Sequence, residues 1–180
     1  GKHITPFGVR LESCDLRIPR ERASRLLDAR GTFGRARLAY RDVASATNRL
    51  TLIAAIVPAG VVTTHTLFCL KTPLDPGDQV FLCGILNSFV ANYLVRFTVT
   101  THVTVRRIER LPVPRPASGD PLLPGIREAA ESLGRGARDA APALQALVAE
   151  LSGLSPGEFR HVLGTFPLVD GSERDAALEV

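Results

Sequence analysis

Alternating and continuous runs of apolar residues predict several strands in the front half of this chain. Residues 37–43 alternate between apolar and polar, as in a half-buried strand. Residues 50–57 form a nearly continuous apolar run whose β-branched side chains favour a buried strand. The turn-like residues 45–49 lie between them, so the two runs can pair as a hairpin. Residues 60–71 predict a third strand region.

The clearest helix prediction covers residues 79–97. Apolar residues recur there at helical spacing on two adjacent lines, and Asp78 in front of them is a good N-cap. We assign Phe89, Tyr93 and Phe97 on this helix to the core. One long buried helix is therefore expected to cross the strand-rich body.

Residues 98–105 predict a further strand, because β-branched threonine and valine dominate them. Arg106, Arg107 and Arg110 follow directly, and a series of prolines then stops the element. Arginine carries a planar group with several donors that suits phosphates and guanine edges. These three arginines are our leading candidates for phosphate contacts; a solvated strand end is the alternative interpretation.

Behind this body the pattern becomes helical. Residues 115–122 read as a linker rich in proline, glycine and serine, and three modest helical stretches follow at 123–133, 142–151 and 156–163. The expected fold class is α+β, with a strand-rich recognition body and one long buried helix, followed by a small helical C-terminal appendage. The expected division is body 1–114, linker 115–122 and appendage 123–180.

Composition is that of an ordinary globular protein. The chain has 180 residues, of which 45% are hydrophobic and 22% charged. Its N-terminal residues lack the apolar core of a signal peptide, and its longest apolar stretch, 80–95, is too short and too interrupted to span a bilayer. We therefore expect no membrane partner. Cys14, Cys69 and Cys83 are widely spaced and odd in number, which favours reduced thiols in a cytoplasmic protein.

Charge is distributed unevenly between the two halves. Residues 1–110 carry 16 basic and 8 acidic residues, a net charge of +8, whereas residues 111–180 carry 6 and 10, a net charge of −4. A basic front half is expected where one part of a protein faces a polyanion. A chance imbalance on a solvated surface is the alternative.

Sequence motifs of catalysis are missing. The chain contains no G-x-G-x-x-G or Walker-type loop and no H-E-x-x-H pair. The four histidines stand apart from cysteines and carboxylates in the sequence, so they form no metal-ligand motif. We therefore expect no active site, metal site or cofactor within these residues.

Four ordered stretches resemble one protein family. They resemble the TaqI-like C-terminal specificity domain, or target-recognition domain, of type IIG-like adenine-specific DNA methyltransferase and restriction enzymes. The matching stretches are GKHITPF (1–7), RLAYRDVASATNRLTLIAAIVP (37–58), LNSFVANYLVR (86–96) with THVT (101–104) and LPVP (111–114), and LVAELSGLSPGEFRHVLGTFPLVD (147–170). The AdoMet-binding glycine loop and the catalytic NPPY-type loop of that family are absent, and residues 10–37 match none of its patterns.

This resemblance implies that DNA binding and methyl transfer belong to different domains. The chain would grip double-stranded DNA, while a methyltransferase domain outside these residues would bind AdoMet and methylate N6 of a flipped adenine. It would then be a fragment of a bacterial restriction–modification or phage-defence protein, and a start at Gly1 without any methionine agrees with that expectation. The partners would be duplex DNA and the missing methyltransferase domain.

Further candidates for DNA contact come from predicted turns, strand ends and a helix over residues 16–30. They are Asn48, Arg49, His65, His102, Arg20 and Arg22. For the two arginines a solvated helix face is the alternative, and for His102 an ordinary strand surface. Asn87 and Asn92 are instead expected to satisfy buried backbone groups, and Arg41 and Asp42 to form a structural salt bridge.

Two other classes of function stay open. In the first, the chain is a protein-interaction module whose acidic tail, residues 111–180, docks on a methyltransferase or a partner subunit without reading DNA. In the second, it is an independent small enzyme, which the empty motif search disfavours.

Overall fold

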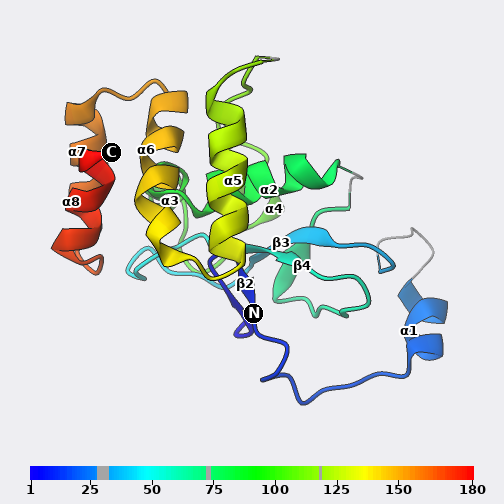
Figure 1. Cartoon of the computed structure of the whole chain (residues 1–180). Helices are drawn as coiled ribbons and strands as arrows, with labels where there is room; N and C mark the ends of the chain where they lie inside the picture. The colour runs from blue at the N-terminus through cyan, green and yellow to red at the C-terminus, as the bar shows by residue number, and fades with distance from the viewer. Residues whose placement is uncertain (28–32, 72–73, 118) are drawn as a thin grey trace.

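The computed structural model describes residues 1–27, 33–71, 74–117 and 119–180 (Figure 1). Its strands are β1 Ile4–Thr5, β2 Gly8–Val9, β3 Arg37–Arg41, β4 Ala54–Val57 and β5 Leu67–Cys69. Its first helices are α1 Arg20–Leu27, α2 Pro76–Asn87, α3 Phe89–Arg96 and α4 Val105–Ile108. The C-terminal helices are α5 Leu122–Gly134, η2 Arg138–Ala140, α6 Ala141–Leu151, α7 Pro156–Gly164 and α8 Gly171–Glu179. The predicted α+β class is thereby confirmed.

A small antiparallel sheet in the order β4-β3-β5 forms the centre of the front half. The predicted hairpin is confirmed, because Tyr40 of β3 pairs with Ala54 of β4, and the third strand pairs with β3 on its other edge. The β1–β2 ribbon joins this sheet through the backbone N–H of Phe7, which donates to Ala54 O at 2.9 Å. The sheet therefore has one covered edge, at β4.

The predicted helix over residues 79–97 is two helices that meet at Ser88 with a bend of 58°. Ser88 has an extended backbone, and its hydroxyl accepts from Ala91 N as the N-cap of α3. The expected N-cap Asp78 was also wrong. Asp75 caps α2, with Pro76 in the first turn, and Asp78 pairs with Arg127 instead.

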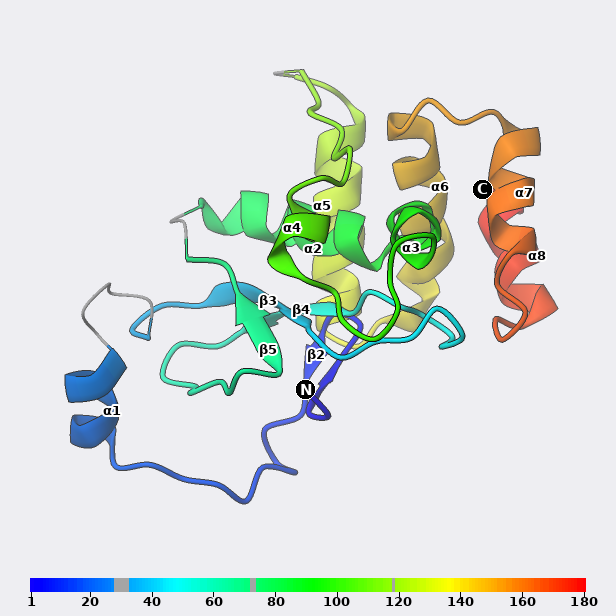
Figure 2. The same cartoon turned by 180° about the vertical axis from the view of Figure 1, so that it is seen from behind.

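Helices α2 and α3 are the centre of the hydrophobic core. One face of α2 packs on the sheet, where Leu86 meets Leu38 and Leu52. Its other face packs on α5 and α6, where Ile85 meets Ile126 and Leu144. Helix α3 continues the core toward α7 and α8 (Figures 1 and 2). The helix pair therefore joins the sheet to the C-terminal helices.

The predicted helical stretches near the C-terminus are confirmed as α5, α6 and α7. Helix α5 begins at Leu122, the last residue of the predicted linker, and packs directly on α2. The core therefore continues across the expected boundary at 115–122. The division into body, linker and appendage stays a prediction.

Helix α1 lies apart from the rest of the molecule (Figure 1). It covers part of the helix predicted over 16–30, whose last three residues lie outside the described residues. Only Ala23 is buried on it, and Leu26 stays 67% exposed. Little of its apolar surface is therefore covered by the described part of the chain.

No single helix in the described ranges is long and apolar enough to cross a membrane. The bent pair α2–α3 passes the same length and composition test only when its two helices are taken together, and most of its residues are buried in the protein core.

Candidate nucleic-acid interface

The strand predicted over residues 98–105 was wrong. Thr98 closes α3, with its N–H and its hydroxyl both donating to Val95 O, and α4 begins at Val105. Between them the chain makes only a bridge from His102 to Val43. Val99 and Val103 point into the core, which uses their β-branched side chains without a ladder. The leading arginine candidates therefore lie on a short helix and the turn after it.

Arg106, Arg107 and Arg110 line one hollow of about 590 Å³. Arg106 and Arg110 are exposed, whereas Arg107 is half-buried and donates to His102 O at 3.2 Å. The remaining lining consists of Thr98, Thr104 and the apolar side chains of Leu94, Leu111 and Pro112. No carboxylate of the described residues lines this hollow, so the three guanidinium groups can all face an anion.

Of the two histidine candidates, His102 lies next to this arginine cluster, because its carbonyl oxygen accepts from Arg107 Nη1. His102 Nδ1 lies 3.0 Å from Asp42 Oδ2, and the backbone N–H of Asp42 donates to Thr66 O, next to His65. Both histidines are exposed. The expected Arg41–Asp42 salt bridge was wrong, because Arg41 donates to Ile4 O instead. His102 therefore lies beside the arginines of α4, whereas His65 lies next to Thr66, whose carbonyl contacts the backbone of Asp42.

Asn48 and Arg49 belong to another region. Both are exposed, but the Arg49 side chain forms an ion pair with Glu173 of α8. Their backbone carbonyls accept from Arg96 Nη2 at 2.5 and 3.0 Å. The loop that carries them is therefore held against the C-terminal helices.

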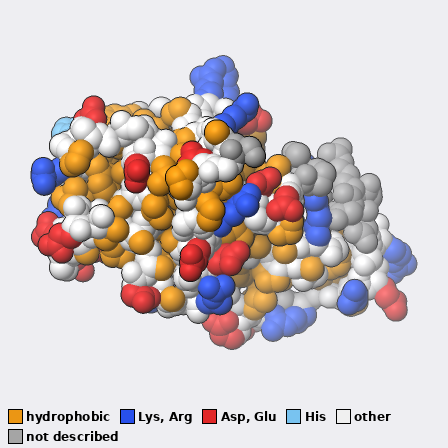
Figure 3. All heavy atoms as spheres, turned by 45° about the horizontal axis from the view of Figure 1, so that its top comes forward, with side chains coloured by type: hydrophobic (Ala, Val, Ile, Leu, Met, Phe, Trp, Pro, Cys, Tyr) orange, Lys and Arg blue, Asp and Glu red, His pale blue; other side chains and the backbone are white. Residues whose placement is uncertain are grey.

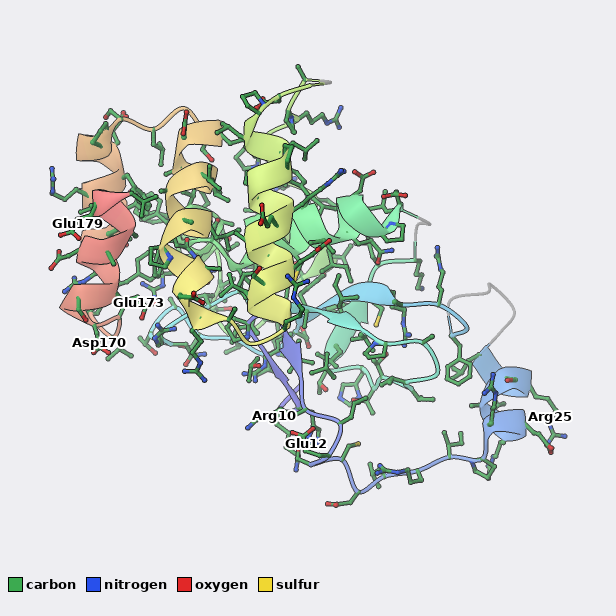
Figure 4. All side chains as sticks on the ribbon, viewed as in Figure 1. Arg10, Glu12, Arg25, Asp170, Glu173 and Glu179 are labelled. Atoms are coloured by element: carbon green, nitrogen blue, oxygen red, sulfur yellow. The ribbon has the colours of Figure 1, made fainter. Side chains whose placement is uncertain are left out.

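Arg20 and Arg22 are exposed on α1, away from the arginine hollow. Arg20 lines a separate hollow of about 330 Å³, together with Ser24 and Phe33. In Figure 4, Arg25 lies on α1 at one side of the molecule. Asp170, at the start of α8, and Glu173 and Glu179, on α8, lie at the other side. The candidates therefore do not form one site, and the group around α4 is the densest.

Phe97 was assigned to the core, and this was wrong. Its side chain is 72% exposed at the end of α3, immediately before Thr98 of the arginine hollow. Its ring meets Tyr93 edge-on at a centroid distance of 4.9 Å, whereas Phe89 is buried as expected. The exposed ring follows Tyr93 on α3 and does not belong to the lining of the hollow. Its helical spacing from Phe89 and Tyr93 had predicted a buried side chain.

The side chains of Asn87 and Asn92 form hydrogen bonds with buried backbone groups, which confirms their expected role. The Asn87 amide accepts from Ala54 N at 3.0 Å and donates to Ala54 O at 2.9 Å. Asn92 Oδ1 accepts from Leu52 N at 2.8 Å. Both side chains are buried, so they position the sheet against the α2–α3 pair rather than reading a ligand.

The C-terminal helices carry a different surface. Figure 3 shows hydrophobic side chains across this part of the molecule, with acidic side chains among them. Leu168 is 59% exposed between α7 and α8, close in sequence to Asp170. This surface is unlike the arginine hollow and is better suited to a protein than to a polyanion.

No group of three or more His, Cys, Asp or Glu side chains that could hold a metal ion occurs in the described residues. No family model, curated protein or solved structure matches this chain. Function must therefore be argued from the residues and their geometry.

Proposed function

We propose that this chain is a specificity domain that binds double-stranded DNA for an adenine-N6 methyltransferase of a bacterial restriction–modification or phage-defence system. Its own contribution is recognition, not methyl transfer. The domain holds the duplex by its phosphates through arginines, and the loops around them select the sequence. We place it in the bacterial cytoplasm, where such DNA is found.

The observation that carries this proposal is the hollow lined by Arg106, Arg107 and Arg110, without a carboxylate from the described residues. Guanidinium groups bind phosphate oxygens in a bidentate manner, and the hydroxyl of Thr104 adds a donor of the kind that contacts DNA backbones. Exposed His102 lies beside the cluster, because its carbonyl oxygen accepts from Arg107 Nη1. The net charge of +8 in residues 1–110 adds a long-range attraction for DNA.

AdoMet belongs to the methyltransferase domain in this proposal. The sequence contains no G-x-G-x-x-G motif that could hold the cofactor. The resemblance in residues 1–7, 37–58, 86–96 and 147–170 supplies the link to adenine methylation, and the arginine hollow supports only the DNA-binding part of it.

A fluorescence anisotropy titration of the chain against a labelled random-sequence duplex, repeated at rising salt, tests the proposal. Three phosphate contacts predict that the logarithm of the binding constant falls with the logarithm of salt with a slope of about −3. Absence of binding at low salt would contradict DNA recognition by the chain itself.

A protein-interaction module is the second candidate, and the acidic C-terminal surface favours it. In that case residues 111–180 dock on a methyltransferase or a partner subunit. Such a module binds duplex DNA weakly or not at all, so the same titration separates the two candidates.

A further inference from the structure

An apolar groove lies on the other face of the sheet from α2. It has a volume of about 590 Å³ and is formed between the segment after β2 and the loop before β5. Aliphatic side chains dominate its lining, and those of Leu11, Leu16, Ile18 and Val62 are between 38% and 83% exposed. So much aliphatic surface in one place is typical of a site that a ligand or a partner covers.

One buried arginine, Arg37, and one half-buried arginine, Arg41, lie beneath this groove. Arg37 is directly paired with Val57 and Arg41 with Leu67, so each arginine shares a sheet face with a residue that lines the groove. Arg37 Nη2 donates to Val61 O at 2.6 Å, and Arg41 donates to Ile4 O. Both acceptors belong to the lining of the groove. The two guanidinium groups therefore reach its walls.

Neither arginine is neutralised within the described part of the chain. Arg37 is only 6% exposed, and its Nη1 has no hydrogen-bond partner; Arg41 Nε is also buried without one. Neither guanidinium forms an ion pair with a carboxylate of the described residues. Burial, with nearby Arg10 adding repulsion, lowers the pKa of Arg41. A buried cation without an anion is unfavourable, so a carboxylate in the groove would stabilise both groups.

We propose that this groove binds a short segment of a partner protein in which carboxylates stand among aliphatic residues. The aliphatic side chains would cover the exposed leucines and valine. The carboxylates would face Lys2 and Arg17, which line the groove, with Arg37 and Arg41 behind its wall. A duplex is a poor occupant, because DNA phosphates offer no apolar surface to an aliphatic groove. This inference does not depend on DNA binding.

Selection of a random dodecapeptide library, displayed on phage, against the full chain tests the proposal. We expect enriched peptides to combine aspartate or glutamate with leucine, isoleucine or valine. A synthetic copy of an enriched peptide should lose at least about tenfold in affinity for Leu16→Asp and Val62→Asp variants, because the new carboxylates repel it and remove apolar contact. Leu168→Asp is the matched control, since that exposed leucine lies far from the groove in sequence, and it should bind the peptide normally.

Charge is tested separately at the exposed rim. Arg17→Glu should lower the affinity of the chain for the acidic peptide by about tenfold, whereas Arg160→Glu on α7 should leave that affinity unchanged. Failure to enrich any peptide, enrichment without acidic residues, or equal binding to Val62→Asp would each overturn the proposal. If sodium decanoate alone stabilises the chain to heat and no peptide is enriched, the occupant is a small amphiphilic anion and the protein segment is wrong.

Discussion

The guanidinium carbon of Arg96 lies 3.9 Å from the centroid of the Phe166 ring. Phe166 is fully buried, and Arg96 Nη1 also donates to the neighbouring Thr165 O at 2.8 Å. The other side of the same group donates to the carbonyls of Asn48 and Arg49. One side chain at the end of α3 therefore fixes a loop of the sheet to the end of α7.

Replacement of this arginine tests how strongly the two parts are joined. Arg96→Ala removes the cation–π contact and the donors to backbone carbonyls, so we expect it to lower the free energy of unfolding by about 2–4 kcal/mol. Arg96→Lys should recover only a part of the lost free energy of unfolding, because one ammonium group cannot donate to all of the carbonyls that the guanidinium contacts. Urea unfolding followed by circular dichroism measures both, with exposed Arg160→Ala as the control. Equal stability of the Ala variant and the wild type would contradict this role.

The Asn87 amide is expected to be essential to the contact between the sheet and α2. Asn87→Leu keeps the number and branching of the side-chain heavy atoms but removes the acceptor of the buried Ala54 N–H, while Ala54 O keeps the N–H of Phe7. We expect a loss of about 2–4 kcal/mol in the free energy of unfolding. Exposed Asn48→Leu should change it by less than about 0.5 kcal/mol. An Asn87→Leu variant as stable as the wild type in urea would show that these hydrogen bonds contribute little.

Tyr40 gives the chain a dependence on high pH. Burial raises the pKa of Tyr40 from 10.0 to about 12, and the carboxylates of Asp42 and Glu109 add to the rise. Its hydroxyl is buried without a hydrogen-bond partner, so the neutral form is favoured. As the pH rises above 10, the unfolded state loses this proton first. The free energy of unfolding should therefore fall between pH 10 and about 12, and be unaffected by this group below pH 10.

Tyr40→Phe should remove that contribution to the slope, whereas Tyr93→Phe should keep it. Urea unfolding at several pH values measures the slope. Ultraviolet absorbance of tyrosinate gives a direct check, because the chain has two tyrosines and no tryptophan. A native Tyr93→Phe protein whose tyrosine ionises with a pKa near 10 would contradict the raised value.

Local pattern was sufficient for the elements that depend on neighbouring residues. The strands β3 and β4 and the helices α5 to α7 follow from alternation and helical spacing, and Ser155 and Glu158 form a capping box at the start of α7. Hydrophobic periodicity could not locate the break at Ser88. There the N–H of Phe89 is satisfied by Gln145 Oε1 at 2.7 Å, a residue that is distant in the sequence.

The candidate site was predictable only in part, for the same reason. The arginines of residues 106–110 are a local cluster, so the sequence indicated them directly. The predicted strand in front of them was wrong because Val99 and Val103 are buried by packing, not by a ladder. Contact of His102 with Asp42 and the pairing of Arg37 with Val57 join residues far apart in the chain. Such partners follow from topology rather than from composition.

The salt dependence of duplex binding by an Arg106→Gln, Arg110→Gln double variant tests the central claim most directly. Both side chains are exposed, so the fold should be kept, and Arg138→Gln, Arg160→Gln removes the same charge from the C-terminal helices as a control. We predict that the double variant binds labelled duplex more weakly and that its salt slope is reduced in magnitude by about 2, whereas the control keeps the slope of the wild type. The same slope and affinity in the wild type and the α4 double variant would contradict DNA recognition through this arginine cluster.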